Sequence, residues 1–235
     1  MRLETEKVKW TKDAEQLWNE NSAGWHARSK NMWESGSRKA VIPFFTKHAE
    51  AGKTVLDIGC GDGYGSRKLA ELGFSVTGID FSRDMLSIAS KENAHPNAVY
   101  QYGNAADLPF PDNAADAVLS INCLEWVSSP RLAVLEIRRI VKAGGLVCIA
   151  ILGPAAGPRI NSYPRLYDKP AACNTMMPWE FTKLAGEAEL KLLDQLPVYK
   201  EGVDGHVANE LSAELKQALS FLTLFMFKNE KEMEK

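Results

Sequence analysis

The chain has 235 residues, of which 45% are hydrophobic and 25% charged, with a formal net charge of −2. A chain of this size and composition can bury one substantial core, so we expect a single domain over residues 1–235. The slight acidity gives no support for a nucleic-acid or membrane partner. The four cysteines show no C-x-x-C spacing, and the N-terminus has no apolar signal segment. These features predict a cytoplasmic protein, with its oligomeric state left open.

Residues 1–50 contain four tryptophans among polar residues: Trp10, Trp18, Trp25 and Trp33. We expect two or three helices there, ahead of the main sheet. The tryptophans either pack these helices together or form a cover over a ligand site.

Residues 55–65, with the sequence VLDIGCGDGYG, join an apolar run, glycines at alternate positions and a helical pattern. This pattern predicts a strand, a tight turn and a helix. Glycine suits such a turn because the backbone takes positive φ and lets a ligand lie against it. Asp80 ends a second apolar strand about 20 residues later, where its carboxylate can accept hydrogen bonds from ribose hydroxyls. The alternative for Asp80 is that it only caps the next helix.

Two cofactor classes use such a turn, and the spacing separates them. The dinucleotide pattern G-x-G-x-x-G fails in both registers, because Tyr64 or Ser66 stands in place of the third glycine. Asp57 would repel a pyrophosphate but suits the ammonium group of a methionine. Over residues 54–152 the chain resembles the class I S-adenosylmethionine-dependent methyltransferases, specifically small-molecule enzymes of the methyltransferase-11 type. A nicotinamide-dependent oxidoreductase is the disfavoured alternative.

The remaining pattern alternates strands and helices, which predicts an α/β fold with a parallel sheet. Strands are expected at 54–58, 75–80, 98–102, 117–121, 146–152, 190–198 and 221–227. Helices are expected at 64–72, 82–92, 130–141, 179–186 and 207–219, with Ser82 and Ser129 as N-caps. Residues 153–178 are too long for an ordinary connection and predict a lid-like insertion.

The resemblance implies a Rossmann-like seven-stranded mixed sheet, of order 3-2-1-4-5-7-6, with helices on both faces. Residues 1–50 would form a helical cover, 54–152 the cofactor-binding core and 179–235 the completion of the sheet. The implied cofactor is S-adenosyl-L-methionine. The implied cofactor-binding residues are Asp57, Gly59, Cys60, Gly61, Asp80, Phe81, Met85, Ala106, Asp107, Asn122 and Cys123.

Two of these residues, Ala106 and Asp107, follow the third strand. By the resemblance the Asp107 carboxylate accepts from the adenine amino group, and the Ala106 N–H faces a ring nitrogen. The alternative is a structural turn of Asx type before Pro109.

Residues 122–126, with the sequence NCLEW, follow the fourth strand. They match neither the N-P-P-aromatic motif of amine-methylating nucleic-acid enzymes nor the Pro-Cys nucleophile of cytosine-carbon enzymes. Cys123 is better interpreted as a buried thiol, and we assign no catalytic residue. The four histidines show no metal-ligand spacing, so no metal site is expected.

The expected function is methyl transfer from S-adenosylmethionine to a small-molecule acceptor, with alignment and water exclusion as the main catalytic devices. The alternatives are a protein that binds the cofactor without turnover and a tRNA- or protein-modifying methyltransferase. The N-terminal segment and the insertion are expected to act together as a cover that sets acceptor specificity. In this cover Trp25, Trp33, Tyr163 and Tyr167 would shield the sulfonium, and Arg28 or Arg165 would meet an acidic acceptor.

Overall fold

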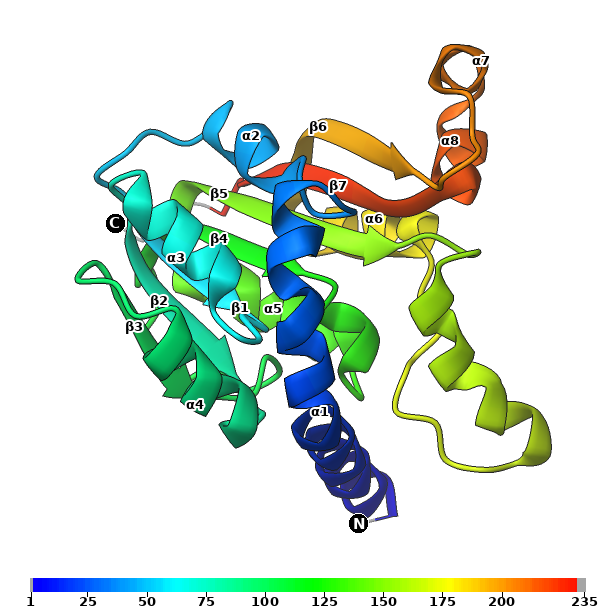
Figure 1. Cartoon of the computed structure of the whole chain (residues 1–235), viewed down its shortest axis with the longest axis horizontal. Coiled ribbons are helices and arrows are strands. Elements are labelled where there is room, and N and C mark those ends of the chain that lie inside the picture. Colours follow the sequence, from blue (N-terminus) through cyan, green and yellow to red (C-terminus); the bar gives the residue numbers. More distant parts are fainter. Residues whose placement is uncertain (1, 232–235) are drawn as a thin grey trace.

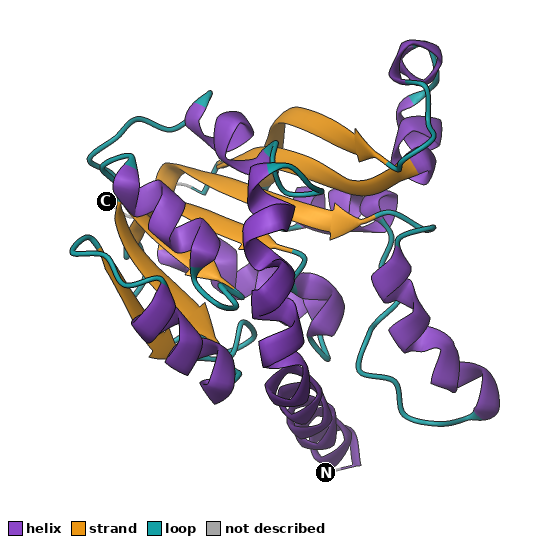
Figure 2. Ribbon diagram, in the orientation of Figure 1, coloured by secondary structure: helices purple, strands orange, loops and turns teal. Residues whose placement is uncertain are grey.

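The computed structural model describes residues 2–231, with the side chains of residues 9–208 and 210–231. The ends of the predicted domain, residue 1 and residues 232–235, lie outside the described residues. A twisted seven-stranded sheet carries helices on both faces (Figures 1 and 2). The strands are β1 (Thr54–Ile58), β2 (Ser75–Asp80), β3 (Ala98–Tyr102), β4 (Ala115–Ile121), β5 (Val141–Leu152), β6 (Leu190–Tyr199) and β7 (Ser220–Asn229).

The α-helices are α1 (Arg2–Glu34), α2 (Val41–Thr46), α3 (Tyr64–Glu71), α4 (Arg83–Glu92), α5 (Pro130–Ile140), α6 (Pro178–Glu187), α7 (Gly205–Asn209) and α8 (Ala213–Leu219). Two 3₁₀ helices join them, η1 (Leu124–Trp126) and η2 (Gly157–Tyr167).

The sheet has the order β3-β2-β1-β4-β5-β7-β6, which confirms the predicted order. The strands β1 to β5 run parallel to their neighbours, whereas β7 is antiparallel to both β5 and β6. Parallel strands need crossover connections, and helices in those connections cover both faces of the sheet. The carboxyl ends of β1, β2 and β4 therefore meet at one edge, where ligands bind in open sheets of this kind.

Each face of the sheet packs into a separate apolar cluster. Along β5, Val147 and Ile149 belong to the cluster beneath α5 and α6, while Cys148 and Ala150 belong to the cluster beneath α2 and α3. Because side chains alternate across a strand, a continuous apolar run serves both clusters. The sheet is thus held from both sides, and its carboxyl edge is fixed in position.

Helix α1 is one continuous helix of 33 residues, and with α2 it gives two helices in the segment where we expected two or three. It crosses the carboxyl edge of the sheet and runs away from it toward the N-terminus (Figure 1). None of the helices within residues 2–231 combines the length and hydrophobicity that a membrane crossing requires.

Several element boundaries differ from the prediction. The expected helix at 207–219 is two helices, because Ser212 interrupts it and caps α8 by accepting from the Leu215 N–H. Strand β5 begins at Val141, so its amino half lies where we expected the end of a helix and a turn. Ser82 caps α4 as predicted, whereas the Ser129 side chain makes no capping bond to α5.

The expected insertion at 153–178 contains η2, which projects from the sheet beyond the end of β5 (Figure 1). The sequence showed no period there, because a 3₁₀ helix with a proline inside it, Pro164, lacks the 3.6-residue repeat. The role of this segment as a lid stays a prediction.

Candidate functional site

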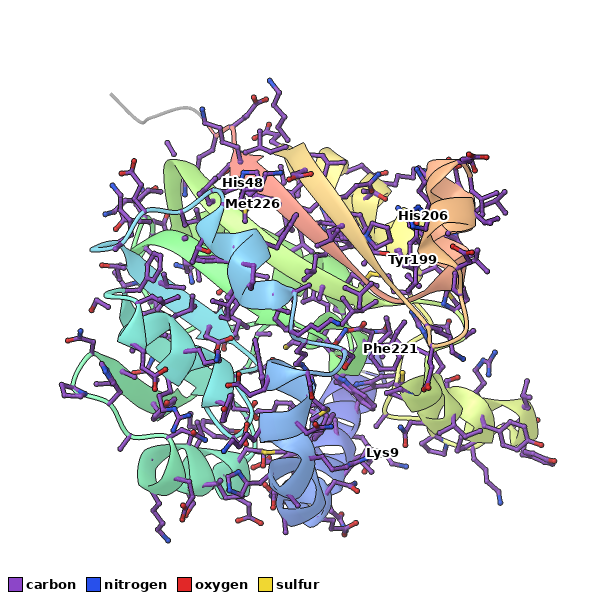
Figure 3. The ribbon with its side chains drawn as sticks, turned by 45° about the horizontal axis from the view of Figure 1, so that its top comes forward. Lys9, His48, Tyr199, His206, Phe221 and Met226 are labelled. Carbon is purple, nitrogen blue, oxygen red and sulfur yellow. The ribbon has the colours of Figure 1, made fainter. Side chains whose placement is uncertain are left out.

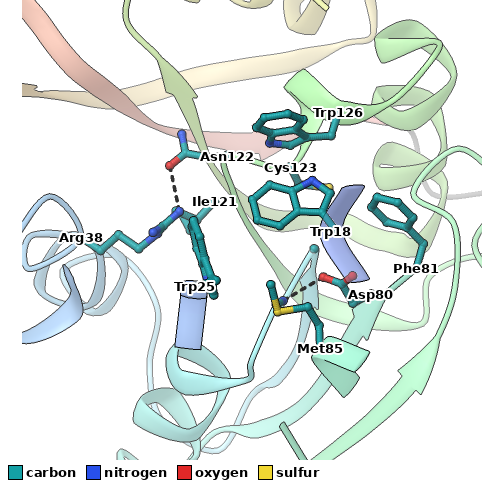
Figure 4. Close-up of a pocket in the computed structure, with 12 residues that line it drawn as sticks. Trp18, Trp25, Arg38, Asp80, Phe81, Met85, Ile121, Asn122, Cys123 and Trp126 are labelled. Atoms are coloured by element: carbon teal, nitrogen blue, oxygen red, sulfur yellow. Dashed lines mark hydrogen bonds between the residues drawn. The ribbon is translucent and has the colours of Figure 1, made fainter. Parts of the chain in front are cut away.

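The carboxyl ends of β1, β2 and β4 border a cleft that α1 covers, shown in close-up in Figure 4. The predicted residues that line it are Gly59, Gly61, Asp80, Phe81, Met85, Asn122 and Cys123. An adjoining cavity shares Gly59, Asp80, Phe81 and Cys123 and continues to the loop after β3. These two cavities are called the cofactor cleft below. The structure therefore brings together residues that lie far apart in the sequence.

The glycine-rich turn forms the floor of the cofactor cleft. Gly59 and Gly61 have φ of 75° and 56°, a region that only glycine enters at little cost. A Cβ on Gly59 would lie 2.6 Å from the Cβ of Cys123, and one on Gly61 would lie 3.5 Å from Nε1 of Trp25. The backbone of the turn is thus bare toward the cleft, which lets a ligand lie directly on it.

Asp80 is held rigidly at the end of β2. Its carboxylate accepts from the Gly61 N–H at 2.9 Å and from the Ser82 N–H at 2.8 Å. Burial raises the pKa of Asp80 to about 6, and the backbone hydrogen bonds oppose this rise. A carboxylate can accept about four hydrogen bonds, so it retains capacity for hydroxyl groups. The contact with the ribose stays a prediction, on a side chain that borders both parts of the cleft.

Asp57 lies deeper than its predicted role suggests. It is 3% exposed, and its Oδ2 accepts from Oγ of Ser66 at 2.6 Å. Burial raises the pKa of Asp57 to about 7. Asp57 is not among the residues that border the cofactor cleft. The predicted contact stays untested.

The loop after β3 forms a turn with its own hydrogen bonds. The Ala106 N–H donates to Oδ1 of Asn104 at 3.0 Å, and the Asp107 N–H donates to the Asn104 carbonyl at 2.9 Å. This is the Asx-type turn that we kept as the alternative. Asp107 is exposed, and Asn104 rather than Asp107 borders the cleft. The adenine contacts of Ala106 and Asp107 stay predictions.

The two cysteines of the prediction differ in position. Cys123 borders the cleft, against Gly59, whereas Cys60 donates a weak hydrogen bond to the Gly61 carbonyl and does not border it. Burial raises the pKa of both thiols, so neither forms a thiolate readily. This protonation state agrees with our interpretation of Cys123 as a buried thiol.

Helix α1 supplies the wall of the cofactor cleft. The sequence analysis expected a helical cover over residues 1–50 but did not name Trp18 or Trp126 as residues of the cleft. The Trp18 ring packs edge-on against the rings of Trp25 and Trp126, at centroid distances of 5.2 and 5.0 Å. The helical tryptophans recur every seven or eight residues, which is two helical turns. This spacing places the tryptophans along one face of a single helix. It is the sequence signal that could have indicated an aromatic helical face in this segment.

Polar contacts fix α1 over the cleft. Oγ of Ser82 donates to Oδ1 of Asn19 at 2.6 Å. In the glycine-rich turn the carboxylate of Asp62 lies 2.8 Å from Nδ1 of His26 and accepts from Oγ of Ser29 at 2.9 Å. Helix α1 is therefore bonded to the two loops that form the floor of the cleft.

Arg38 is a buried cation beside the cleft that the sequence analysis missed. It is 6% exposed, and its guanidinium lies 4.5 Å from the centre of the Trp25 ring. Its Nη2 donates to Oδ1 of Asn122 at 3.3 Å (Figure 4). Burial lowers the pKa of Arg38 to about 10, which leaves it charged at neutral pH. A guanidinium in this setting suits a carboxylate or another anionic oxygen.

A larger cavity of about 430 Å³ opens beside the cofactor cleft, between α1, the start of η2 and Phe221. We call it the chamber. Its polar lining residues are Asn21, Arg28, Ser37, Arg38, Asn122 and Asn161, and its apolar ones are Leu17, Trp18, Trp25, Met32, Trp126, Leu152, Pro158 and Phe221. Of the residues expected in the cover, Trp25 and Arg28 border the chamber. The other residues expected in the cover do not border the chamber: Trp33, Tyr163, Arg165 and Tyr167.

Comparison with known proteins supports the same assignment. Residues 56–149 match the methyltransferase domain family. The demethylmenaquinone methyltransferase of Tropheryma whipplei (strain Twist) is 40% identical over 100 residues, which are 42% of this chain and 41% of the relative. The malonyl-(acyl-carrier protein) O-methyltransferase of Erwinia billingiae (strain Eb661) is 32% identical over 136 residues, which are 58% of this chain and 53% of the relative. The chain thus spans about half the length of these curated relatives.

Among solved structures, a chain from the Haloferax volcanii complex of the Trm112 methyltransferase activator superposes with a TM-score of 0.69 at 23% identity. The match covers 90% of this chain and 97% of that chain, and it supports the fold. The matched residues 56–149 hold both the glycine-rich turn and Asp80. The predicted resemblance to the class I S-adenosylmethionine-dependent methyltransferases is confirmed over this segment, because residues 56–149 match the methyltransferase domain family and the sheet has the order that the resemblance implies.

Proposed function

We propose that the chain transfers a methyl group from S-adenosylmethionine to a small-molecule acceptor bound in the chamber. One observation carries this proposal: the cofactor cleft and the chamber share a wall. The shared residues are Trp18, Trp25, Arg38, Asn122 and Trp126. A donor in the cleft and an acceptor in the chamber would face each other across this boundary, and such alignment can supply about 7–11 kcal/mol of the barrier.

The floor of the cleft fits the proposed cofactor. The bare glycine backbone and the buried carboxylate of Asp80 suit a nucleoside laid along the strand ends. When bound, the cofactor supplies a methyl group already activated by a sulfonium. Its cationic charge is favoured by the faces of Trp18, Trp25 and Trp126, each worth about 0.5–2 kcal/mol, and its carboxylate by Arg38.

The chamber itself offers little acid–base chemistry. Within the described part of the chain, neither a histidine nor a carboxylate is among its lining residues. The protein therefore contributes by holding the acceptor in line and by excluding water, and we assign proton removal to no residue. This suits a reaction in which the donor is already activated.

The size of the chamber favours a small-molecule acceptor. Its volume falls within the range of about 300–1,000 Å³ that is usual for such ligands. The two relatives are named for demethylmenaquinone and for malonyl on acyl-carrier protein, and neither name describes a nucleic acid. The net charge of −2 also disfavours a tRNA substrate.

A turnover assay tests the proposal. The protein is incubated with S-adenosylmethionine and pooled metabolites, and S-adenosylhomocysteine formation is measured. We expect acceptor-dependent product that falls in Asp80→Ala and persists in Asp84→Ala, a matched change at an exposed position of α4. Binding of the cofactor with no product from any pool would indicate a binding protein without turnover. Product formed only with tRNA or with a protein substrate would also overturn the proposal.

A further inference from the structure

A second cavity continues the chamber outward between α1 and η2. Its volume is about 670 Å³, and it is bordered by residues of α1 and by residues 160–172. We call it the groove. Leu17 and Asn161 border both the chamber and the groove, so the two cavities adjoin at these residues. Figure 3 shows Phe221, which borders the chamber, and Lys9, which borders the groove, on the side of α1 that faces η2.

The two cavities differ in chemistry. The charged residues that border the chamber within the described chain are both cations, Arg28 and Arg38, and its aromatic walls suit a flat ring. The groove is mainly apolar, and its two charged residues, Lys9 and Asp13, are exposed and of opposite sign. Polarity therefore falls from the chamber to the groove.

The groove also holds apolar surface that the chain itself leaves uncovered. Ile160 borders it while 68% of its surface is exposed. Trp10 and Leu17 on α1 and Pro164 on η2 face the same space. Apolar surface of this kind gains free energy when a ligand covers it, in proportion to the area removed from water.

We infer that the acceptor is an amphiphile with a flat, acidic head and an apolar tail. The head lies in the chamber, with its anionic oxygen toward Arg28, and the tail leaves along the groove past Leu17 and Ile160. The order of the cavities sets this orientation, because the chamber and not the groove shares its wall with the cofactor cleft. This inference rests on the proposed function and adds the class of acceptor.

Alkylbenzoates of increasing chain length are suitable probes, because they combine a flat acidic ring with a variable tail. Binding of para-butyl-, para-hexyl- and para-octylbenzoate is measured by calorimetry, with and without S-adenosylhomocysteine, below the concentrations at which the probes form micelles. We expect the affinity to rise about twofold to fourfold with each added methylene group. Affinity that does not change with chain length overturns the inference.

Variants locate the tail. Ile160→Glu should reduce the octyl-to-butyl affinity ratio by about tenfold or more, because a charge then borders the apolar path. Leu166→Glu is the matched control, since Leu166 is 63% exposed on the same 3₁₀ helix and borders neither cavity. The two side chains are both exposed, so neither change should prevent folding. Equal loss in both variants would mean that the tail binds elsewhere, and the inference would fail.

A second pair of variants locates the head. The parent should prefer para-octylbenzoate over the neutral para-octylbenzyl alcohol. Arg28→Gln should reduce this preference about twofold to fivefold, the range of a partly exposed ion pair. Lys30→Gln, on the same helix but outside the lining of the chamber, should leave it unchanged. A preference that Arg28→Gln does not alter, or no preference in the parent, contradicts the acidic head.

These outcomes are separable from those of the turnover assay. A protein that binds the probes as expected but forms no S-adenosylhomocysteine from any acceptor would retain the amphiphile site and lose the proposed transfer. A protein that forms product with a short acceptor and shows no dependence on chain length would retain the transfer and lose the amphiphile.

Discussion

The floor of the cofactor cleft is built mainly from backbone, whereas its α1 wall is built from side chains. On the floor, positive-φ glycines and two N–H groups hold the carboxylate of Asp80. On the wall, Trp18, Trp25 and the guanidinium of Arg38 face that floor. The backbone of the floor can bind the nucleoside part of the cofactor, which is the same for every acceptor. The side chains of the wall can differ between proteins that act on different acceptors. We therefore connect the floor with the nucleoside of the donor, and the wall with the boundary at which donor and acceptor meet.

The two sides also differ in charge. The floor buries the carboxyl groups of Asp57 and Asp80, and the wall buries the cation Arg38. Burial is the main cause that raises the pKa of Asp57, and the positive charge of the nearby Arg38 lowers it. Burying these carboxylates in their charged form therefore costs free energy of folding, and a bound cationic ligand would offset this cost.

The largest expected effect is on stability and tests the charge of the floor. Because the pKa of Asp57 is raised to about 7, the folded chain binds more protons than the unfolded chain between about pH 4 and 7. Stability should therefore fall as pH rises through this interval. Asp57→Asn, which can still accept from Ser66, should raise the free energy of unfolding at about pH 8 by on the order of 3 kcal/mol. Thermal unfolding at about pH 8 and pH 4 measures it, with little change expected at the lower pH.

A matched change at the opposite edge of the sheet, near the amino end of β4, should change stability in the opposite direction. Asp116, near the start of β4, accepts from Nζ of Lys142 at 2.8 Å and from the Thr54 N–H at 2.9 Å. These hydrogen bonds lower the pKa of Asp116, so its contribution to stability is present above its unfolded pKa and is lost as pH falls. Asp116→Asn should therefore lower the melting temperature at about pH 8. If Asp57→Asn and Asp116→Asn shift the melting temperature in the same direction, the buried charge of Asp57 does not destabilise the protein as we propose.

The next largest effect concerns the donor. Asp80→Ala removes the acceptor predicted for the ribose hydroxyls and leaves the Gly61 and Ser82 N–H groups without their partner. We expect the affinity for S-adenosylhomocysteine to fall by about 1–3 kcal/mol, as measured by calorimetry. Asp84→Ala serves as the exposed control. Unchanged affinity in Asp80→Ala, or tighter binding of a nicotinamide dinucleotide by the parent, would remove this assignment.

A smaller effect is expected at the wall. The two parts of the cleft hold only about 40 Å³ and 20 Å³ of free space beneath the α1 wall, so we expect α1 to shift when the cofactor enters. Trp18→Ala removes the ring that packs against both Trp25 and Trp126, which should loosen this cover. The dissociation rate of S-adenosylhomocysteine should rise about twofold to thirtyfold in stopped-flow measurements, from a loss of about 0.5–2 kcal/mol.

Trp179→Ala provides the comparison for Trp18→Ala. Trp179 is 42% exposed on α6 and borders neither the cleft nor the chamber. Its removal should leave the dissociation rate unchanged. A rate that both variants raise equally would reflect general loosening of the protein, and a rate that neither changes would mean that the α1 wall does not hold the cofactor.

The floor was predictable from sequence because its geometry is local. Positive φ at Gly59 and Gly61 follows from the turn between a strand and a helix, and the place of Asp80 follows from the end of the adjacent strand. The connections alone indicated a parallel sheet with right-handed crossovers, and the strand order, including the final hairpin, came from the resemblance to a family.

The wall was not predictable in the same way, because it depends on where a long helix crosses the sheet. Arg38 lies after α1 in a segment without regular structure, and only tertiary packing brings it to Asn122. Trp126 borders the cleft because a 3₁₀ turn follows β4, which periodicity does not reveal. The two-turn spacing of the tryptophans indicated one helical face but not which strands it would cover.

The smallest expected effect lies at the adenine end of the floor. The resemblance assigns the adenine contact to Asp107, whereas in the structure Asn104 borders the cleft. The Ala106 N–H already donates to Asn104, so we predict that the exposed Asp107 carboxylate alone discriminates the base. Asp107→Ala should weaken S-adenosylhomocysteine about twofold to tenfold, the value of one hydrogen bond near solvent. It should weaken S-inosylhomocysteine less, because that analogue lacks the amino group. Calorimetry with both nucleosides measures the difference, and an equal loss for the two would mean that Asp107 serves only the turn.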